Sequence, residues 1–103
     1  MKLEPVGLTP AAIEQVRYIM AHKNIPVEYA LRIGVKGAGC GVGFQLGFDK
    51  VKESDLSYLV DDIRVLVDKK HTMYLLGVTV DYYSGADAQG FTFVKEEVAN
   101  APK

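Results

Sequence analysis

Hydrophobic residues along the chain follow a helical period first and an alternating period afterwards. After Pro10, apolar residues recur at helical spacing: Ile13, Val16 and Met20. Thr9 and Pro10 precede them and suit a helix start, because threonine can cap free N–H groups and proline lacks a donor where none is needed. Asn24 and Pro26 are stop signals. The pattern therefore predicts an amphipathic helix over residues 10–23.

Beyond the helix, apolar and polar residues mostly alternate, which is typical of half-buried strands. The alternation predicts strands over these ranges: 29–36, 44–49, 56–60, 63–67, 78–83 and 91–94. Asp61 and Asp62 suit a tight turn inside a hairpin. A short helix is expected over 68–76, with Asp68 as its cap and Gly77 as its stop. This order favours a compact α+β domain in which mostly antiparallel strands pack beside two helices.

Length and charge narrow the class of protein. The 103 residues correspond to one domain, 1–103, and the polar end over 95–103 is expected to be a flexible tail. The net charge of -1, without a long run of one sign, argues against nucleic-acid binding. No signal peptide is recognisable, and no apolar run approaches the roughly 18 residues of a membrane span. We expect a cytoplasmic protein that binds no membrane.

The only cysteine, Cys40, lies in a glycine-rich stretch between two predicted strands. Gly37, Gly39, Gly41 and Gly43 occupy alternate positions around it. Glycine lets a ligand approach the main chain, and successive N–H groups can attract an anion. The stretch therefore either presents a thiolate, or an anionic sulfur-rich group bound by it, or is a hairpin connection with an incidental cysteine.

Other candidate residues carry weaker signals. Asp61 and Asp62 could form a metal site or an acid/base pair, but no converging oxygen ligands are visible nearby in the sequence. His22 is most simply a solvated residue in the last helical turn, and His71 lacks a spaced partner ligand. Because catalysis by cysteine needs a nearby base and an orienting group, and neither histidine has a recognisable catalytic context, we expect no enzyme.

Several fragments, in this order and spacing, resemble the A-type iron-sulfur carrier family, also called the HesB/IscA family. They are, in chain order, Leu8-Thr9-Pro10-Ala11-Ala12, Leu31-Arg32-Ile33-Gly34-Val35, Gly39-Cys40-Gly41, Leu46-Gly47-Phe48 and Gly90-Phe91-Thr92-Phe93. The resemblance implies a small β sandwich with flanking helices, forming a homodimer or tetramer. It also implies transient binding of iron or an iron-sulfur cluster through Cys40 and delivery to apo-proteins, with iron-sulfur assembly proteins or apo-protein recipients as partners.

Family members characteristically carry a further Cys-Gly-Cys pair near the C-terminus, for which this chain has no counterpart. Because a cluster normally takes about four thiolates, other ligands, small thiols, a partner's cysteines or a higher oligomer would have to complete the site. The C-terminal region offers four oxygen donors as candidates: Asp81, Tyr82, Tyr83 and Asp87. Two alternatives to the carrier remain open: a scaffold domain without metal, and a redox-responsive protein that uses its single thiol.

Overall fold

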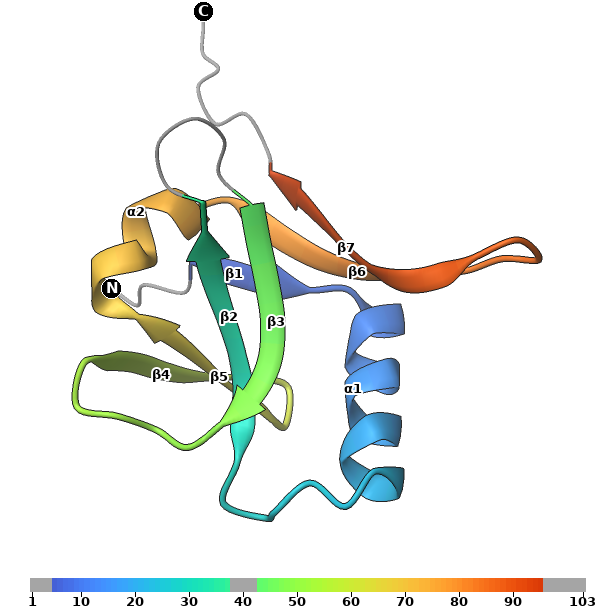
Figure 1. The fold of residues 1–103 in the computed structure, drawn as a ribbon, viewed down its shortest axis with the longest axis horizontal. Helices are drawn as coiled ribbons and strands as arrows, with labels where there is room; N and C mark the ends of the chain where they lie inside the picture. Colours follow the sequence, from blue (N-terminus) through green and yellow to red (C-terminus); the bar gives the residue numbers. More distant parts are fainter. Residues whose placement is uncertain (1–4, 38–42, 96–103) are drawn as a thin grey trace, which may run out of the picture.

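The fold consists of two β-sheets and one long helix. A computed structural model describes residues 5–37 and 43–95. Its elements are β1 (Val6–Leu8), α1 (Pro10–His22), β2 (Ala30–Lys36), β3 (Gly43–Asp49), β4 (Asp55–Val60), β5 (Ile63–Asp68), a 3-10 turn η1 (Lys69–His71), α2 (Thr72–Leu75), β6 (Val78–Ser84) and β7 (Gln89–Lys95). Strands β1-β6-β7 form one sheet and β3-β2-β5-β4 form the other (Figure 1).

Three of the strand pairs are antiparallel hairpins: β2–β3, β4–β5 and β6–β7. Strand β2 pairs in parallel with β5, and β1 pairs in parallel with β6. The two helices flank the sheets (Figure 1). The expected α+β class, a small and mostly antiparallel β sandwich with two flanking helices, is therefore confirmed.

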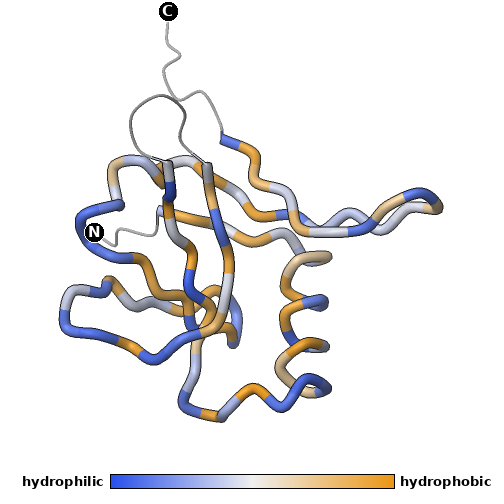
Figure 2. Tube along the Cα trace, viewed as in Figure 1, coloured by the Kyte–Doolittle hydropathy of each residue, from blue (hydrophilic) through white to orange (hydrophobic). Residues whose placement is uncertain are grey.

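The core lies between the sheets and the inner face of α1. It contains residues from both sheets and from the helix: among them Ala12, Ile13, Val16, Leu31, Ile33, Val65, Val67, Val78 and Val80. Figure 2 shows the alternation along the strands, with hydrophobic and hydrophilic positions following one another. Burial of these apolar side chains, at about 25 cal/mol per Å², supplies the main driving force for folding.

One buried tyrosine ties the two sheets together by polar contacts. The Tyr58 hydroxyl, on β4, accepts a hydrogen bond from the Val6 backbone N–H at 2.9 Å and donates one to the Val6 carbonyl at 2.8 Å. Both residues are buried. Because backbone groups of a short strand need partners in an apolar interior, this contact explains how β1 can lie in the core.

The long helix agrees with the sequence prediction in its start and its stop. The Thr9 hydroxyl accepts the Ala12 N–H at 3.2 Å, and Pro10 is the first helical residue. Asn24 has a φ of 58°, the left-handed conformation that asparagine tolerates. The hairpin turn is also confirmed, with Asp61 at a φ of 55° between β4 and β5.

Three local expectations were wrong in detail. Strand β1 was not foreseen, because its three residues between Pro5 and Thr9 are too few to show alternation. The predicted helix over 68–76 is a 3-10 turn followed by a four-residue α-helix. Lys95, expected in the tail, is the last residue of β7; residues 96–103 lie outside the described part. Among the described helices, none has both the length and the apolar character needed to cross a membrane.

Candidate functional site

The described residues on either side of the glycine-rich stretch form the open end of the β2–β3 hairpin. Lys36, the last residue of β2, is the register partner of Gly43, the first of β3. Gly37 follows with a φ of 72°, a conformation that favours glycine. Cys40, Gly39 and Gly41 lie outside the described residues. What the structure defines is therefore the base from which the Cys40 segment starts and to which it returns.

An aromatic contact joins this base to the other sheet. The rings of Phe44, on β3, and Phe93, on β7, have centroids 5.6 Å apart with a tilt of 33°. Both side chains are half-buried against the core. The end of β7 therefore lies beside the start of β3, as Figure 1 also shows. The described part of the chain begins again at Gly43, next to Phe44, and ends at Lys95, two residues after Phe93.

The end of β7 also contacts α2 through a hydrogen bond. The Lys95 ammonium donates a hydrogen bond to the Tyr74 carbonyl at 2.9 Å. Large apolar side chains are exposed on this part of the molecule: Met73, Tyr74, Leu76 and Val94. We call the region formed by Lys36, Gly37, Gly43, Phe44 and the end of β7 the loop end.

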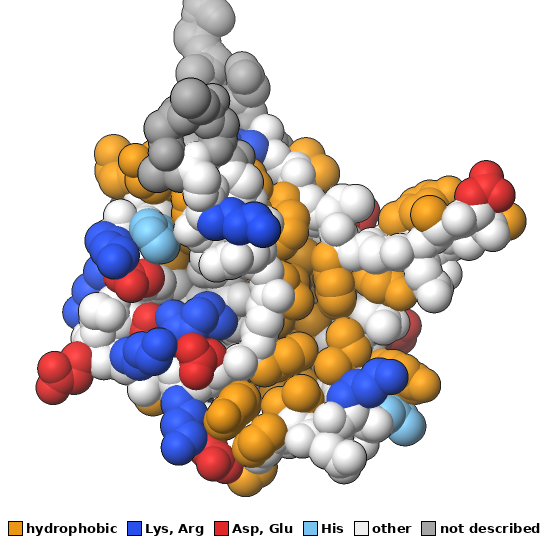
Figure 3. Space-filling model, viewed as in Figure 1, with side chains coloured by type: hydrophobic (Ala, Val, Ile, Leu, Met, Phe, Trp, Pro, Cys, Tyr) orange, Lys and Arg blue, Asp and Glu red, His pale blue; other side chains and the backbone are white. Residues whose placement is uncertain are grey.

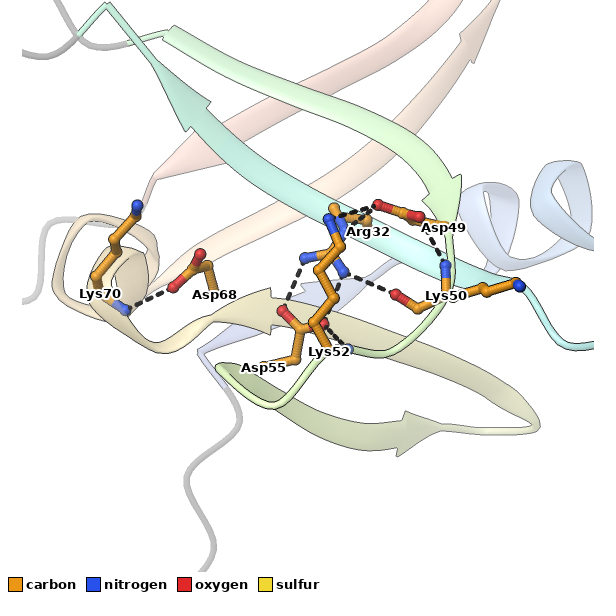
Figure 4. A network of polar contacts seen from close by, with 7 residues as sticks. All are labelled: Arg32, Asp49, Lys50, Lys52, Asp55, Asp68 and Lys70. Carbon is orange, nitrogen blue, oxygen red and sulfur yellow. Dashed lines mark hydrogen bonds and ion pairs between the residues drawn. The ribbon is translucent and has the colours of Figure 1, made fainter.

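The opposite end of the hairpin is closed by an ionic network (Figure 4). The Arg32 guanidinium donates to both carboxylate oxygens of Asp55, at 2.8 and 2.7 Å, and to Asp49 at 3.1 Å. It also donates to the Lys50 carbonyl at 3.0 Å. The Asp55 side chain is fully buried and also accepts the Lys52 N–H at 2.7 Å. The sequence did not predict this network; its signal was Arg32, a charged residue between the buried Leu31 and Ile33.

These contacts shift the acidity of the groups involved. The hydrogen bonds from Arg32 lower the pKa of Asp55, although its burial acts in the opposite direction. The pKa of Asp49 is lowered first by the hydrogen bond from the Lys50 backbone N–H. The pKa of Arg32 is raised by Asp55. All three groups are charged and satisfied at neutral pH, which is typical of a structural network with no vacant ligand position.

The remaining candidate residues do not form a metal site in the described part of the chain. Asp62 accepts two hydrogen bonds from Arg17, at 3.0 and 2.7 Å, and with Asp61 makes the hairpin turn. The His22 Nδ1 donates to the Tyr18 carbonyl at 2.9 Å, and its ring stacks on that tyrosine. His71 lies in η1. No cluster of three or more metal-ligating side chains occurs over residues 5–37 and 43–95.

The four candidate oxygen donors lie along β6 and beyond it, away from the loop end. Asp81 accepts from the Thr9 hydroxyl at 2.6 Å and from the Tyr82 N–H, and the Thr9 contact lowers its pKa. The Tyr82 ring packs on Phe91 at 5.0 Å. Tyr83 and Asp87 are exposed and lie towards the tip of the β6–β7 hairpin. The structure gives these residues local packing and capping contacts and does not bring them to the base of the Cys40 segment.

Comparison with known protein families shows which family this chain belongs to. Residues 5–101 match the family described as iron-sulphur cluster biosynthesis. The chain belongs to this family. The match covers both sheets, the loop end and the Cys40 segment, so the family resemblance drawn from the sequence fragments is confirmed.

Two relatives with curated names support the same assignment. The chain is 37% identical over 92 residues to the iron-sulfur cluster insertion protein ErpA of Glaesserella parasuis, a match that covers 86% of this chain and 80% of the relative. It is 33% identical over 98 residues to the mitochondrial iron-sulfur cluster assembly 1 homolog of Mus musculus, covering 89% and 74%. These relatives are named for cluster assembly and insertion, which agrees with the expectation that the chain is not an enzyme.

Solved structures show the same fold. The crystal structure of Escherichia coli SufA, involved in biosynthesis of iron-sulfur clusters, superposes with a TM-score of 0.79 at 27% identity over 100% of this chain and 90% of that chain. The crystal structure of IscA with the [2Fe-2S] cluster gives 0.70 at 27% identity, over 87% and 84%. The chain is thus an iron-sulfur cluster assembly protein of the A-type carrier kind, from a family in which cluster binding is known.

Proposed function

We propose that this protein binds iron or an iron-sulfur cluster transiently through Cys40 and passes it to apo-proteins. The observation that carries the proposal is the arrangement of the loop end. The Lys36–Gly43 register and the Phe44–Phe93 contact hold the base of the Cys40 segment beside the end of β7. The only thiol of the chain belongs to the segment that joins these two strand ends.

The number of thiols makes the binding exchangeable. A cluster normally takes about four thiolates, whereas this chain has one cysteine. Two copies supply half of a conventional ligand set. The remaining positions would be filled by small thiols, by other ligand types or by cysteines of the recipient. Incomplete coordination suits a protein that releases the cluster, because each cysteine of the recipient can replace a weakly bound small thiol or other ligand.

The proposal includes a homodimer or tetramer in the cytoplasm. Self-association is one way to meet the coordination requirement, since one copy alone offers a single thiolate. Its partners are iron-sulfur assembly proteins on the supply side and apo-protein recipients on the delivery side. The exposed apolar side chains near the loop end, Met73, Tyr74, Leu76 and Val94, provide contact area for such partners close to the cargo.

Anaerobic reconstitution tests the proposal directly. Wild type and Cys40→Ser are incubated with ferrous iron, sulfide and a small thiol, then desalted and assayed for iron, sulfide and visible absorbance. We expect charge-transfer bands and bound iron in the wild type and neither in the variant. Equal iron in both proteins would contradict ligation by Cys40. A colourless, iron-free wild type would favour a metal-free interaction domain of the same fold.

Matched variants separate ligand loss from general damage. His71→Ala and His22→Ala remove the described imidazoles, and we expect both to reconstitute as the wild type does. Near-UV circular dichroism of Cys40→Ser before reconstitution should equal that of the wild type. A single-thiol redox response would instead appear as a reductant-sensitive dimer formed without iron.

A further inference from the structure

Strand β7 (Gln89–Lys95) is an edge strand that lacks most of the features that prevent pairing with another chain. In the described part of the chain it pairs with β6 on one side only. Edge strands usually carry lysine, proline or a bulge that blocks pairing with another chain. From Gln89 to Val94 this strand has no charge and no proline, and its register with β6 runs through seven successive pairs without a bulge. Its free edge can therefore accept another strand.

The side chains on this strand are also incompletely covered. Phe91 and Phe93 are half-buried, and Val94 is 56% exposed. Figure 3 shows hydrophobic side chains gathered on the visible face where the β6–β7 hairpin meets the body of the molecule. A partner strand would remove this apolar surface from water while satisfying the free backbone groups.

We propose that a second copy of this chain occupies the edge, with the two β7 strands antiparallel about a two-fold axis at Thr92. Each three-stranded sheet would then continue into its copy. The inference deepens the self-association within the proposed function and rests on it, but it does not depend on metal binding.

The sequence of β7 is complementary to itself in this register. Thr92 faces Thr92 of the other copy and Phe91 faces Phe93, both of them favourable cross-strand pairs. Val94 faces Gly90, where an added Cβ would meet no atom within 4 Å, so the exposed valine has room. Gln89 faces Lys95. No pair brings like charges together, and the isologous contact closes after two copies.

The other edge strands of the described part are β1, β3 and β4, and they fit less well. Strand β1 has only three residues, and the Val6 N–H and carbonyl already bond the Tyr58 hydroxyl. Strand β3 ends in Asp49, whose carboxylate is held by Arg32 and Lys52 at that end of the sheet. Strand β4 begins with Asp55, whose carboxylate is committed to Arg32. The edges of β3 and β4 therefore place residues of the ionic network at one end of any new strand pairing. Strand β7 carries a charge only at its last residue, Lys95.

The same axis would bring the two loop ends together. A two-fold axis perpendicular to a joined sheet keeps the core-facing side of both copies on one face. Phe93 lies next to the axis residue and contacts Phe44, one residue after Gly43. Both β3 starts would therefore lie on one face near the axis, so two Cys40 segments would begin close to each other.

Disulfide trapping tests the register without any metal. Cys40→Ser removes the native thiol, and Thr92→Cys in that background places two thiols at the axis, where opposed residues have Cβ atoms about 5 Å apart. Mild oxidation with diamide should convert most of the protein into a reductant-sensitive covalent dimer. Thr79→Cys in the same background is the control, since Thr79 lies on β6 opposite Val94 and away from the axis. We expect it to remain monomeric on non-reducing gels.

Analytical ultracentrifugation of the unmodified chain and of Thr92→Lys gives an independent readout. The lysine would place two like charges directly opposite each other, and we expect at least a tenfold increase in the dimer dissociation constant. A monomeric wild type at about 100 µM would overturn both self-association and this surface. A dimer that persists in Thr92→Lys and gives no trapped Thr92→Cys species would overturn the β7 surface alone. Neither result would touch ligation by Cys40, which reconstitution measures.

Discussion

The two ends of the β2–β3 hairpin are held by different chemistry. At one end Arg32 makes charged hydrogen bonds to Asp49 and Asp55, and the Asp55 side chain is fully buried. At the loop end the contacts are the tilted Phe44–Phe93 pair and one hydrogen bond from Lys95 to the Tyr74 carbonyl. The first end has every polar group satisfied, and the second leads into the segment that carries the only cysteine.

This difference indicates a division between stability and function. Charged, directional contacts fix the register of the hairpin at the end opposite Lys36 and Gly43, so the loop end does not need to contribute strongly to folding. The described contacts at the loop end are an aromatic pair and one exposed hydrogen bond, which tolerate small displacements and suit the proposed exchange of a ligand. The closed end should therefore respond to mutation by unfolding and the loop end by losing cargo.

Removing the acid at the closed end should have the largest effect on stability. In Asp55→Ala the Arg32 guanidinium loses its two shortest charged contacts, and we expect a loss of about 3 kcal/mol, as for other buried pairs broken from one side. Urea unfolding measures it. Asp62→Ala breaks the exposed Arg17–Asp62 pair, which solvent screens, and should cost much less. Equal losses would contradict the structural role of the network.

The hydrogen bonds between Tyr58 and Val6 should have the second largest effect on stability. In Tyr58→Phe the Val6 N–H and carbonyl lose buried partners, and we expect a loss of about 2 kcal/mol. The same urea titration gives the value. A loss below about 0.5 kcal/mol would show that β1 is held without the hydroxyl.

The aromatic contact at the loop end should matter less for stability. Phe44→Leu keeps an apolar side chain and loses the ring pair, which is worth about 1 kcal/mol. Iron content after reconstitution should fall more than stability does. A double-mutant cycle with Phe93→Leu isolates the coupling, and a coupling of zero would contradict the contact.

Acid should weaken the closed end selectively. Because the folded pKa of Asp55 is lowered by Arg32, its contribution is present above the unfolded pKa of about 3.9 and is lost as pH falls through the folded value. The wild type should lose stability below about pH 4, and Asp55→Asn should show a shallower decline. Identical slopes would assign the acid sensitivity to other carboxylates.

Patterns that are local in sequence were predictable. The Thr9 cap, the Asn24 stop and the Asp61-Asp62 turn follow from residue chemistry within a few positions, and the alternation located six strands. The Cys40 segment could be identified as the candidate site because its glycines are close to the cysteine in sequence. Ligation by Cys40 stays a prediction.

Contacts between distant segments were not predictable in the same way. Arg32 and Asp55 are 23 residues apart, and Val6 and Tyr58 are 52 apart. Neither pair has a periodic signal, because Arg32 and Tyr58 bond groups that only the fold brings near: a carboxylate in one case and a backbone N–H and carbonyl in the other. The Phe44–Phe93 contact is similar: alternation assigns both rings to inner faces and cannot pair them.

Cluster delivery is the most direct test of the account. Reconstituted protein is mixed anaerobically with an apo [2Fe-2S] ferredoxin and a chelator that traps free iron, and the ferredoxin spectrum is followed with time. We expect the wild type to fill the ferredoxin despite the chelator, whereas Cys40→Ser treated identically should give no more than iron and sulfide alone. Equal filling by both proteins would contradict a carrier that works through Cys40.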